Sequence, residues 1–336
     1  MESAIKKSSY GTEALTPEEI KKYKAQKMAY NISGKAWKVF RGFLLFGLCI
    51  VIIYPLLYAI SVAFRPVADI FDPSIMWIPK RVTLDNFKEV IITMKYPKAL
   101  VTSLQVNILS ALLQVCTCAL TGYGFARFNF KGKKAFFGLL LFSILVPVQV
   151  IVTPMYLNFK SFNFLGIGSI VGLFTGTPLT IPLLNTPWTF YLPAILACGI
   201  KSGVVVYLFK QFFSGMPKEL EDAAAIDGCG FMSCFLRIII PNASAVILTA
   251  LVLSVVWYWN DYFIGSMMMS GHATVTVKLS GLPSEIAAMN NYDNDPYKMV
   301  SKMQAAVLLT IAPVLIMYLI VQKYFVQGVE RSGIVG

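Results

Sequence analysis

The sequence is poor in charged residues and has almost no histidine. Only 14% of its 336 residues are Asp, Glu, Lys or Arg, and there is a single histidine, His272. This scarcity excludes a Ser/His/Asp triad, a paired-carboxylate site and a Cys/His metal site, because none of these patterns can be assembled. The six cysteines fall mainly in or beside apolar segments and are interpreted as small, reduced, buried side chains: Cys49, Cys116, Cys118, Cys198, Cys229 and Cys234.

The sequence also lacks the polar surface of a soluble protein. Hydrophobic residues make up 57% of the chain, and the mean hydropathy of +0.66 places it among integral membrane proteins. A formal net charge of +12 is typical of nucleic-acid binders as well. In an apolar chain, however, Lys and Arg gather beside lipid headgroups. We therefore expect an all-α protein whose partner is the lipid bilayer and not nucleic acid.

Six apolar runs are long enough to cross a bilayer, which takes about 20 residues. With alternating sides, 18 Lys and Arg residues fall on the side of the N-terminus and 10 on the other, and Lys201 lies inside a run. The positive-inside rule then places both termini in the cytosol. Residues 1–41 are too charged for a cleaved signal peptide, so they are expected to remain as a cytosolic extension. The expected spans are 43–64, 101–126, 135–156, 189–211, 243–264 and 304–324.

One uncharged stretch does not fit this count of spans. Residues 165–186 are apolar but contain Pro178 and Pro182, and Gly168, Gly172 and Gly176 follow at intervals of four. A further span here would reverse the charge bias of everything after it. We expect a re-entrant or interfacial insertion on the outer side, whose glycines either bring helices into contact or mark loops.

The segment 217–241 contrasts with its apolar neighbours. Pro217 suits the first turn of a helix, three acids follow among five residues, and Gly228 supplies a stop, which together predict a short helix over 217–227. A second short apolar helix should follow and end at Pro241. One face of the first helix, with Ala223 and Ala224, is shallow enough for close approach. The pair either docks in a groove on a partner or packs on its own bundle.

The spacing of this segment resembles the cytosolic coupling loop of binding-protein-dependent ABC importer permeases. That pattern reads Glu-Ala-Ala, three residues, Gly, nine residues, Ile, one residue, Leu-Pro. This chain has Asp222-Ala223-Ala224, Gly228, Ile238 and Ile240-Pro241 at the same spacing, with Asp for Glu and Ile for Leu. The resemblance implies that the ATPase is contacted by Glu221, Asp222, Ala223, Ala224, Asp227, Gly228, Ile238 and Pro241.

Other stretches are similar to the carbohydrate branch, such as the maltose permease MalG and the multiple-sugar and raffinose-type permeases. They include "YPLLYAISVAFRP", "TGYGFARFNFKGKKAFF", "WYWNDYFIGSMMMS" and "YFVQGVERSGIVG". The resemblance implies a MetI-like permease domain over 42–326 and a cytosolic tail over 327–336. In that tail Gln327, Gly328, Glu330 and Arg331 would face the ATPase. The 165–186 insertion is longer than the usual family connection.

The resemblance further implies a subunit of a sugar importer in the bacterial cytoplasmic membrane. Its partners would be a second, different permease, an ABC ATPase dimer and an extracellular sugar-binding protein. The chain has no Gly-x-x-x-x-Gly-Lys-Ser/Thr loop, so ATP and Mg would belong to the ATPase, and this subunit would be neither an enzyme nor a holder of cofactors or metals. "KLSGLPSE" at 278–285 echoes an ATPase signature by coincidence.

A sugar path calls for aromatic faces and polar groups at membrane depth. Trp257, Tyr258, Asn260 and Asp261 supply them late in the fifth span, although an aromatic belt at the interface is an alternative interpretation. Lys201 is expected either to pair with Asp261 or to snorkel to the surface. Two other functions stay open: a permease of the same architecture for a non-sugar solute, and a self-contained secondary transporter, for which Asp261 is the only nearby acid.

Overall fold

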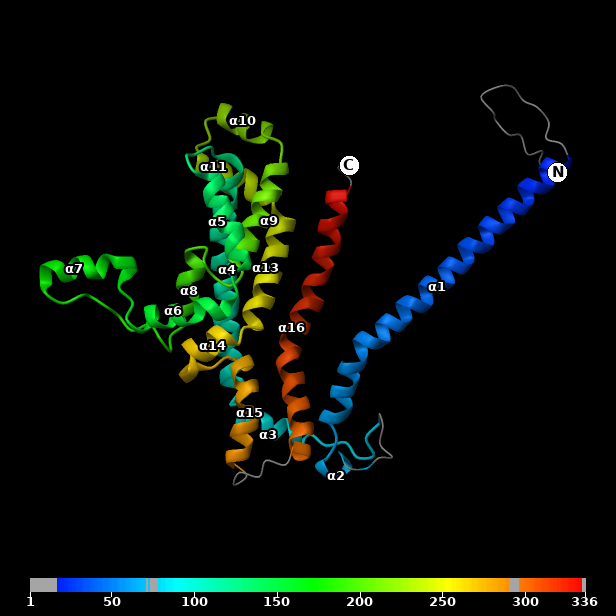
Figure 1. Cartoon of the computed structure of the whole chain (residues 1–336), viewed down its shortest axis with the longest axis horizontal. Coiled ribbons are helices and arrows are strands. Elements are labelled where there is room, and N and C mark those ends of the chain that lie inside the picture. The colour runs from blue at the N-terminus through cyan, green and yellow to red at the C-terminus, as the bar shows by residue number, and fades with distance from the viewer. Residues whose placement is uncertain (1–16, 71, 73–77, 290–295, 334–336) are drawn as a thin grey trace. The chain divides into compact units, whose positions relative to one another are not determined.

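The computed structural model describes residues 17–70, 72, 78–289 and 296–333, and it divides into two units, Met1–Ile60 and Ser61–Gly336. The first unit holds most of helix α1 (Pro17–Ala63), drawn in blue in Figure 1. Residues 17–41 of the expected extension and nearly all of the expected first span, 43–64, are therefore parts of one continuous helix. Its portion Trp37–Ala63 is long and apolar enough to cross a membrane.

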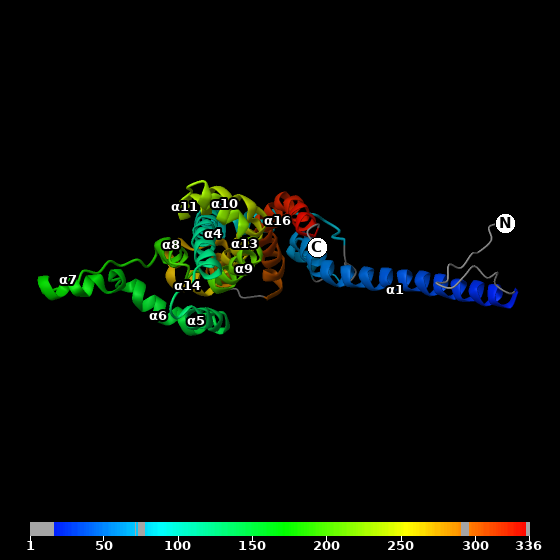
Figure 2. The same cartoon turned by 90° about the horizontal axis from the view of Figure 1, so that it is seen from above.

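The second unit is built around α4 (Tyr96–Arg127), a helix of 32 residues. Packed against it are α8 (Trp188–Ile195), α9 (Ser202–Gly215) and α13 (Ser244–Trp259). Figures 1 and 2 show α4, α9 and α13 lying side by side. The α4 and α9 backbones touch at Gly122, where an added β-carbon would lie 2.6 Å from the β-carbon of Phe209. Glycine is needed here because any side chain would push the two helices apart.

Three helices of the described chain are long and apolar enough to span a membrane, and two bent helix pairs raise the number to five. The three single helices are Trp37–Ala63, Tyr96–Arg127 and Met299–Lys323, which correspond to the expected spans 43–64, 101–126 and 304–324. The bent pairs are Lys133–Leu145 with Val148–Lys160 and Phe231–Asn242 with Ser244–Trp259, and they overlap the expected spans 135–156 and 243–264. The one expected span that is left, 189–211, requires a correction.

The remaining span, 189–211, fourth in chain order, was expected to be continuous and is broken. Helix α8 ends at Ile195, α9 begins at Ser202, and the intervening backbone adopts positive φ angles at Ala197 (54°) and Lys201 (53°). Such left-handed residues cannot continue a right-handed helix. The prediction of one uninterrupted helix is wrong because apolarity, which the run does have, does not guarantee helical backbone.

A sharp bend also separates α5 (Lys133–Leu145) from α6 (Val148–Lys160), whose axes differ by 103°. The two helices meet at Val146 and Pro147. Val146 has an extended backbone (φ −74°, ψ 119°), as expected for a residue that precedes proline. The expected run 135–156 therefore folds as two helices with a corner between them.

The 165–186 insertion contains the single-turn η1 (Phe164–Gly166), α7 (Ile167–Thr175) and a returning segment. Figures 1 and 2 show α7 projecting away from the α4, α9 and α13 bundle. An added β-carbon at Gly168 would lie 2.0 Å from the Leu179 carbonyl oxygen, and one at Gly172 would lie 2.8 Å from Pro178 Cα. Gly168 and Gly172 thus pack against the insertion's own returning chain, whereas Gly176 has no atom within 4 Å of an added β-carbon and ends α7 with a positive φ of 79°.

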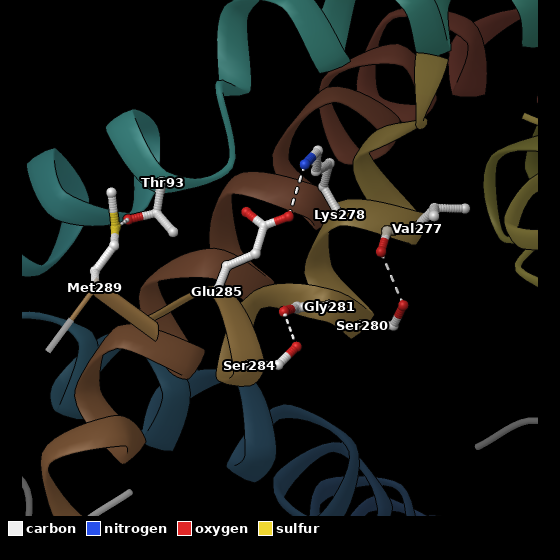
Figure 3. A network of polar contacts seen from close by, with 8 residues as sticks. All are labelled: Thr93, Val277, Lys278, Ser280, Gly281, Ser284, Glu285 and Met289. Atoms are coloured by element: carbon white, nitrogen blue, oxygen red, sulfur yellow. Dashed lines mark hydrogen bonds and ion pairs between the residues drawn. The ribbon is translucent and has the colours of Figure 1, made fainter. Parts of the chain in front are cut away.

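At the end of the unit opposite the 217–241 segment, short elements pack around α3 (Asp85–Thr93) and α15 (Val275–Met289). Figure 3 shows the contacts along α15: Lys278 pairs with Glu285 at 2.7 Å, and the Thr93 hydroxyl donates to the Met289 sulfur. The "KLSGLPSE" residues therefore lie in a helix. Further elements of this unit are α2 (Val67–Ile70), α14 (Phe263–Met268), η3 (Ser270–His272) and the long helix α16 (Pro296–Gly333), which also packs against α13.

Candidate functional site

The expected coupling helix is present as α10 (Glu219–Ile226), which lies inside the range 217–227. Three acids occupy its first turn, where they oppose the helix dipole. At its other end the Gly228 amide donates to the Ala225 carbonyl at 3.1 Å and the Cys229 amide to the Ala224 carbonyl at 2.9 Å. These two bonds form a Schellman motif, which satisfies the last carbonyls of the helix.

Gly228 occupies the left-handed position of that motif, with φ at 76°. No heavy atom lies within 4 Å of the position that a β-carbon would take. The space beside Gly228 is therefore open. Glycine is instead favoured by the backbone angle, which L-residues with a side chain adopt only at a cost.

An ion pair ties α10 to the end of α4. Arg127 Nε lies 2.6 Å from Glu221 Oε1, and Arg127 Nη2 donates to the Met216 carbonyl at 2.9 Å. The two charged side chains are only 7% and 22% exposed, so water screens the pair weakly. Glu221, expected to contact a partner, thus binds its own chain. Arg127 was missed by sequence reasoning, because no local pattern announces a partner so distant in the chain.

Aromatic rings fill the space beneath α10. Tyr123 of α4 lies 5.5 Å from Phe213, 5.4 Å from Phe231 and 5.0 Å from Phe235, measured between ring centroids. Ala224 packs into the same core and is buried. The expectation that Ala224 helps form the face presented to a partner is therefore wrong, since this alanine allows α10 to lie close to α4 and α9.

The outward surface of α10 does not include Glu221 or Ala224. Asp222, Ala223 and Asp227 are exposed, as their expected role requires, and Leu220 lies beside them. Ile226 is 87% exposed. An apolar side chain so open on a short helix has no partner within the described chain, and sequence reasoning did not select it. The sequence does mark Ile226, because it is a large apolar residue directly before the C-cap of a helix made mostly of alanine and acidic residues.

The second short helix runs from α11 (Phe231–Cys234) through a π-helical turn (Phe235–Ile239) into α12 (Ile240–Asn242). Pro241 was expected to end it, but the helix continues through Pro241. It then bends by 80° into α13. Because proline has no backbone N–H, it removes one hydrogen bond of the ladder, and a wider turn precedes it. Ile238 is half-buried against the core beneath α10.

The expected path residues separate into two groups. Tyr258 is 2% exposed and donates its hydroxyl to Gln114 Oε1 at 2.7 Å. Asp261 accepts hydrogen bonds from the amides of Gly265 at 2.8 Å and Ile264 at 3.4 Å. Both side chains therefore hold the fold together. Asn260 is exposed, and its amide group donates to the Val256 carbonyl at 2.9 Å.

Of the two courses expected for Lys201, the ion pair with Asp261 is not formed in the described part of the chain, and snorkelling to the surface stays a prediction. The Lys201 ammonium instead lies 5.1 Å from the ring centroid of Trp257. A cation over an indole face is held by the ring's quadrupole. Of the expected path residues, Trp257 is partly exposed and Asn260 is exposed, whereas Tyr258 is buried.

Gln114 secures the break between α8 and α9. Its amide group donates to the Ile200 carbonyl at 3.0 Å and to the Ser254 hydroxyl at 3.3 Å, and it lies fully buried. The Thr117 hydroxyl donates to the Ala194 carbonyl at 2.7 Å. The Ile200 carbonyl thereby gains a side-chain partner just before α9, and the Ala194 carbonyl accepts the Thr117 hydroxyl in addition to the Ala197 amide. A glutamine inside an apolar span was the available signal, and sequence reasoning missed it.

Two further expectations concern the tail and metals. The α16 backbone continues through Gln327, Gly328, Glu330 and Arg331 to Gly333, but the side chains of these four residues lie outside what the structure describes. Among the described residues, no group of three or more His, Cys, Asp or Glu side chains is arranged to hold a metal ion.

Comparison with known proteins places these features in a family. The model of the "Binding-protein-dependent transport system inner membrane component" family matches residues 119–331, more than half of the chain. The chain is 27% identical over 305 residues to the arabinooligosaccharides transport system permease protein AraQ of Halalkalibacterium halodurans, covering 90% of this chain and 97% of that protein. It is 26% identical to the trehalose transport system permease protein SugB of Mycobacterium tuberculosis, covering 84% and 92%.

A solved structure supports the same fold. A chain of a bacterial ABC transporter involved in the import of the acidic polysaccharide alginate matches with a TM-score of 0.67 and 18% identity, covering 87% of this chain and 98% of that one. At this identity the likeness shows the fold alone. The chain belongs to the family of inner membrane components of binding-protein-dependent transport systems, as a multi-pass membrane protein with the all-helical ABC permease fold.

Proposed function

We propose that this chain is a permease subunit of an ATP-driven importer that moves a sugar across the bacterial cytoplasmic membrane. Its relatives are named for arabinooligosaccharides and trehalose, which supports a saccharide substrate. The importer would also contain a second, different permease, two ABC ATPases that bind ATP and Mg, and an external sugar-binding protein. Both termini and the 217–241 segment face the cytosol in this arrangement, as the distribution of Lys and Arg favours.

The observation that carries the proposal is the construction of α10. One side of the helix is fixed to α4 by the Arg127–Glu221 ion pair and by the aromatic cluster around Tyr123. Its other side presents Ala223, Asp227 and the open Ile226. One side of α10 is held rigidly by its own chain, and the other exposes a small and a large apolar side chain. A helix of this kind is suited to a cleft on an ATPase. When the ATPase dimer closes, the force on α10 passes to α4 and the helices packed on it. The solute path then changes from inward-open to outward-open.

The test is to replace Ile226 by Asp in the complete importer and to measure both sugar uptake and co-purification of the ATPase. A buried carboxylate in the proposed contact should remove most of the ATPase from the purified complex and abolish uptake. The matched control is Val82→Asp, because Val82 is an equally apolar, exposed residue (72%) at the far end of the unit. Full ATPase recovery with Ile226→Asp would contradict the proposal.

A further inference from the structure

With the 217–241 segment in the cytosol, as the proposed function has it, Lys201 falls at membrane depth. It directly precedes α9, a helix of 14 residues whose other end leads into the coupling segment. At about 1.5 Å per residue, α9 is roughly 21 Å long, while the hydrocarbon core of a bilayer is about 30 Å thick. The Lys201 backbone is therefore far from the cytosolic surface. Trp257, near the end of α13, reaches a matching depth from the neighbouring helix.

The charge of Lys201 is not neutralised within the described chain. The ammonium lies 5.1 Å from the centroid of the Trp257 ring, and no ion pair to it is present among the described residues. The nearest expected partner, Asp261, uses both carboxylate oxygens on the amides that begin α14. Lys201 is nevertheless exposed on the surface of the chain. A lysine directed at lipid at this depth is costly, so an exposed one is expected to face the interior of the assembled importer, where the solute path and the second permease lie.

The surroundings hold this lysine in place. Its backbone has the left-handed φ of 53°, and the preceding Ile200 carbonyl is bound by Gln114 at 3.0 Å. Gly199 fits tightly, since an added β-carbon would lie 2.3 Å from the Tyr258 hydroxyl oxygen and 2.4 Å from Gln114 Oε1. The break between α8 and α9 thus holds the backbone of Lys201, and the contact with the Trp257 ring positions its ammonium group. A group held this way binds a ligand with little loss of entropy.

We propose that Lys201 and Trp257 form a contact site for an acidic saccharide, with a uronate carboxylate on the ammonium and the apolar face of a sugar ring beside the indole. An ammonium offers three donors to a carboxylate, and a charge-assisted hydrogen bond is about twice as strong as a neutral one. A neutral sugar would leave the lysine without a counter-charge in the path. This inference rests on the proposed function and narrows its substrate class.

The experiment compares cellular uptake of two labelled trisaccharides by the complete importer, one of galacturonic acid and one of galactose. The variants are Lys201→Gln, which removes the charge, and Lys201→Arg, which keeps it. We expect wild type to import the acidic trisaccharide, Lys201→Gln to reduce that uptake about tenfold, and Lys201→Arg to retain most of it. Recovery of the ATPase with Lys201→Gln, at wild-type yield, shows that the complex still assembles.

Each other outcome overturns the inference in a distinct way. Equal loss of acidic and neutral uptake in Lys201→Gln would make the lysine a structural residue or one that pairs with the second permease. Unchanged acidic uptake would show that it is not part of the site. Import of the neutral trisaccharide alone by wild type would reject the acidic class but leave the importer intact. Import of neither trisaccharide would reject this inference, while the proposed function would still be decided by the Ile226→Asp test.

Discussion

Arg127, the last residue of α4, and Glu221, in the first turn of α10, form an ion pair of 2.6 Å that joins two segments 94 positions apart in the chain. The same guanidinium also holds the Met216 carbonyl just before α10. Two points, the Glu221 carboxylate and the Met216 carbonyl, are thereby fixed to one side chain of the central helix α4. The position of α10 relative to α4 is set by this contact and by the aromatic rings beneath it.

Arg127→Ala should destabilise the protein by about 2 kcal/mol, because it leaves Glu221 in a weakly hydrated site without its partner. Uptake should fall even under conditions where the variant stays folded, since α10 loses its fixed orientation. Thermal unfolding in detergent and sugar uptake measure the two effects. Exchanging the charges, as Arg127→Glu with Glu221→Arg, should recover part of the lost stability.

The control for that prediction is Lys88→Ala, which removes the exposed pair between Lys88 and Asp85. Their side chains are 72% and 80% exposed, so the pair is screened by water and its loss should leave unfolding and uptake unchanged. If Arg127→Ala behaves like Lys88→Ala, the contact with Glu221 does not fix α10.

Gly228→Ala should destabilise the coupling segment by about 1 to 2 kcal/mol, although space for the methyl group is free. The cause is the positive φ of 76°, which alanine adopts only under strain. Gly230→Ala is the matched control, because Gly230 has φ of −68° and no atom near its added β-carbon either. Chemical denaturation of the two variants measures the difference. Equal stability of both would show that the Schellman motif at Gly228 is not needed.

The features that sequence reasoning predicted well are those with local causes. Pro217, the acids that follow it and Gly228 act within one or two turns of chain, so the helix and its end could be placed. The orientation of that helix could not be predicted, because it depends on Arg127 and Tyr123 in a distant segment. Ala224, assigned to a partner's face, lies in the chain's own core for this reason.

The path residues show the same limit. Polar groups at membrane depth need partners, but the sequence alone does not say whether those partners are a solute or the protein itself. Tyr258 is satisfied by Gln114 and Asp261 by two backbone amides. Lys201 and Trp257 stay accessible, because they meet at a helix break that the apolar run 189–211 conceals. Hydropathy predicted that this run lies in an apolar environment, but it could not predict the break in its helix.

Gly122→Ala should destabilise the bundle by about 1 to 3 kcal/mol through overpacking. The new methyl group would lie 2.6 Å from the Phe209 β-carbon and 2.9 Å from the Lys210 amide nitrogen, so α4 and α9 must separate. Gly124→Ala is the control, since its nearest neighbour would be a Phe128 ring carbon at 3.9 Å. Thermal unfolding compares the two. A stable Gly122→Ala variant would mean that the α4 and α9 contact can widen without loss.

Gln114→Leu should cost about 1 to 3 kcal/mol, because the Ile200 carbonyl and the Tyr258 hydroxyl are left buried without their partner. In a Tyr258→Phe background the same change should cost less, since the hydroxyl that needs Gln114 is already gone. Gln105→Leu, an exposed position on the same helix, is the control and should leave stability unchanged. Thermal unfolding of the four-member cycle gives the coupling between residues 114 and 258. A coupling of zero would contradict the role of Gln114 as the residue that secures the break between α8 and α9.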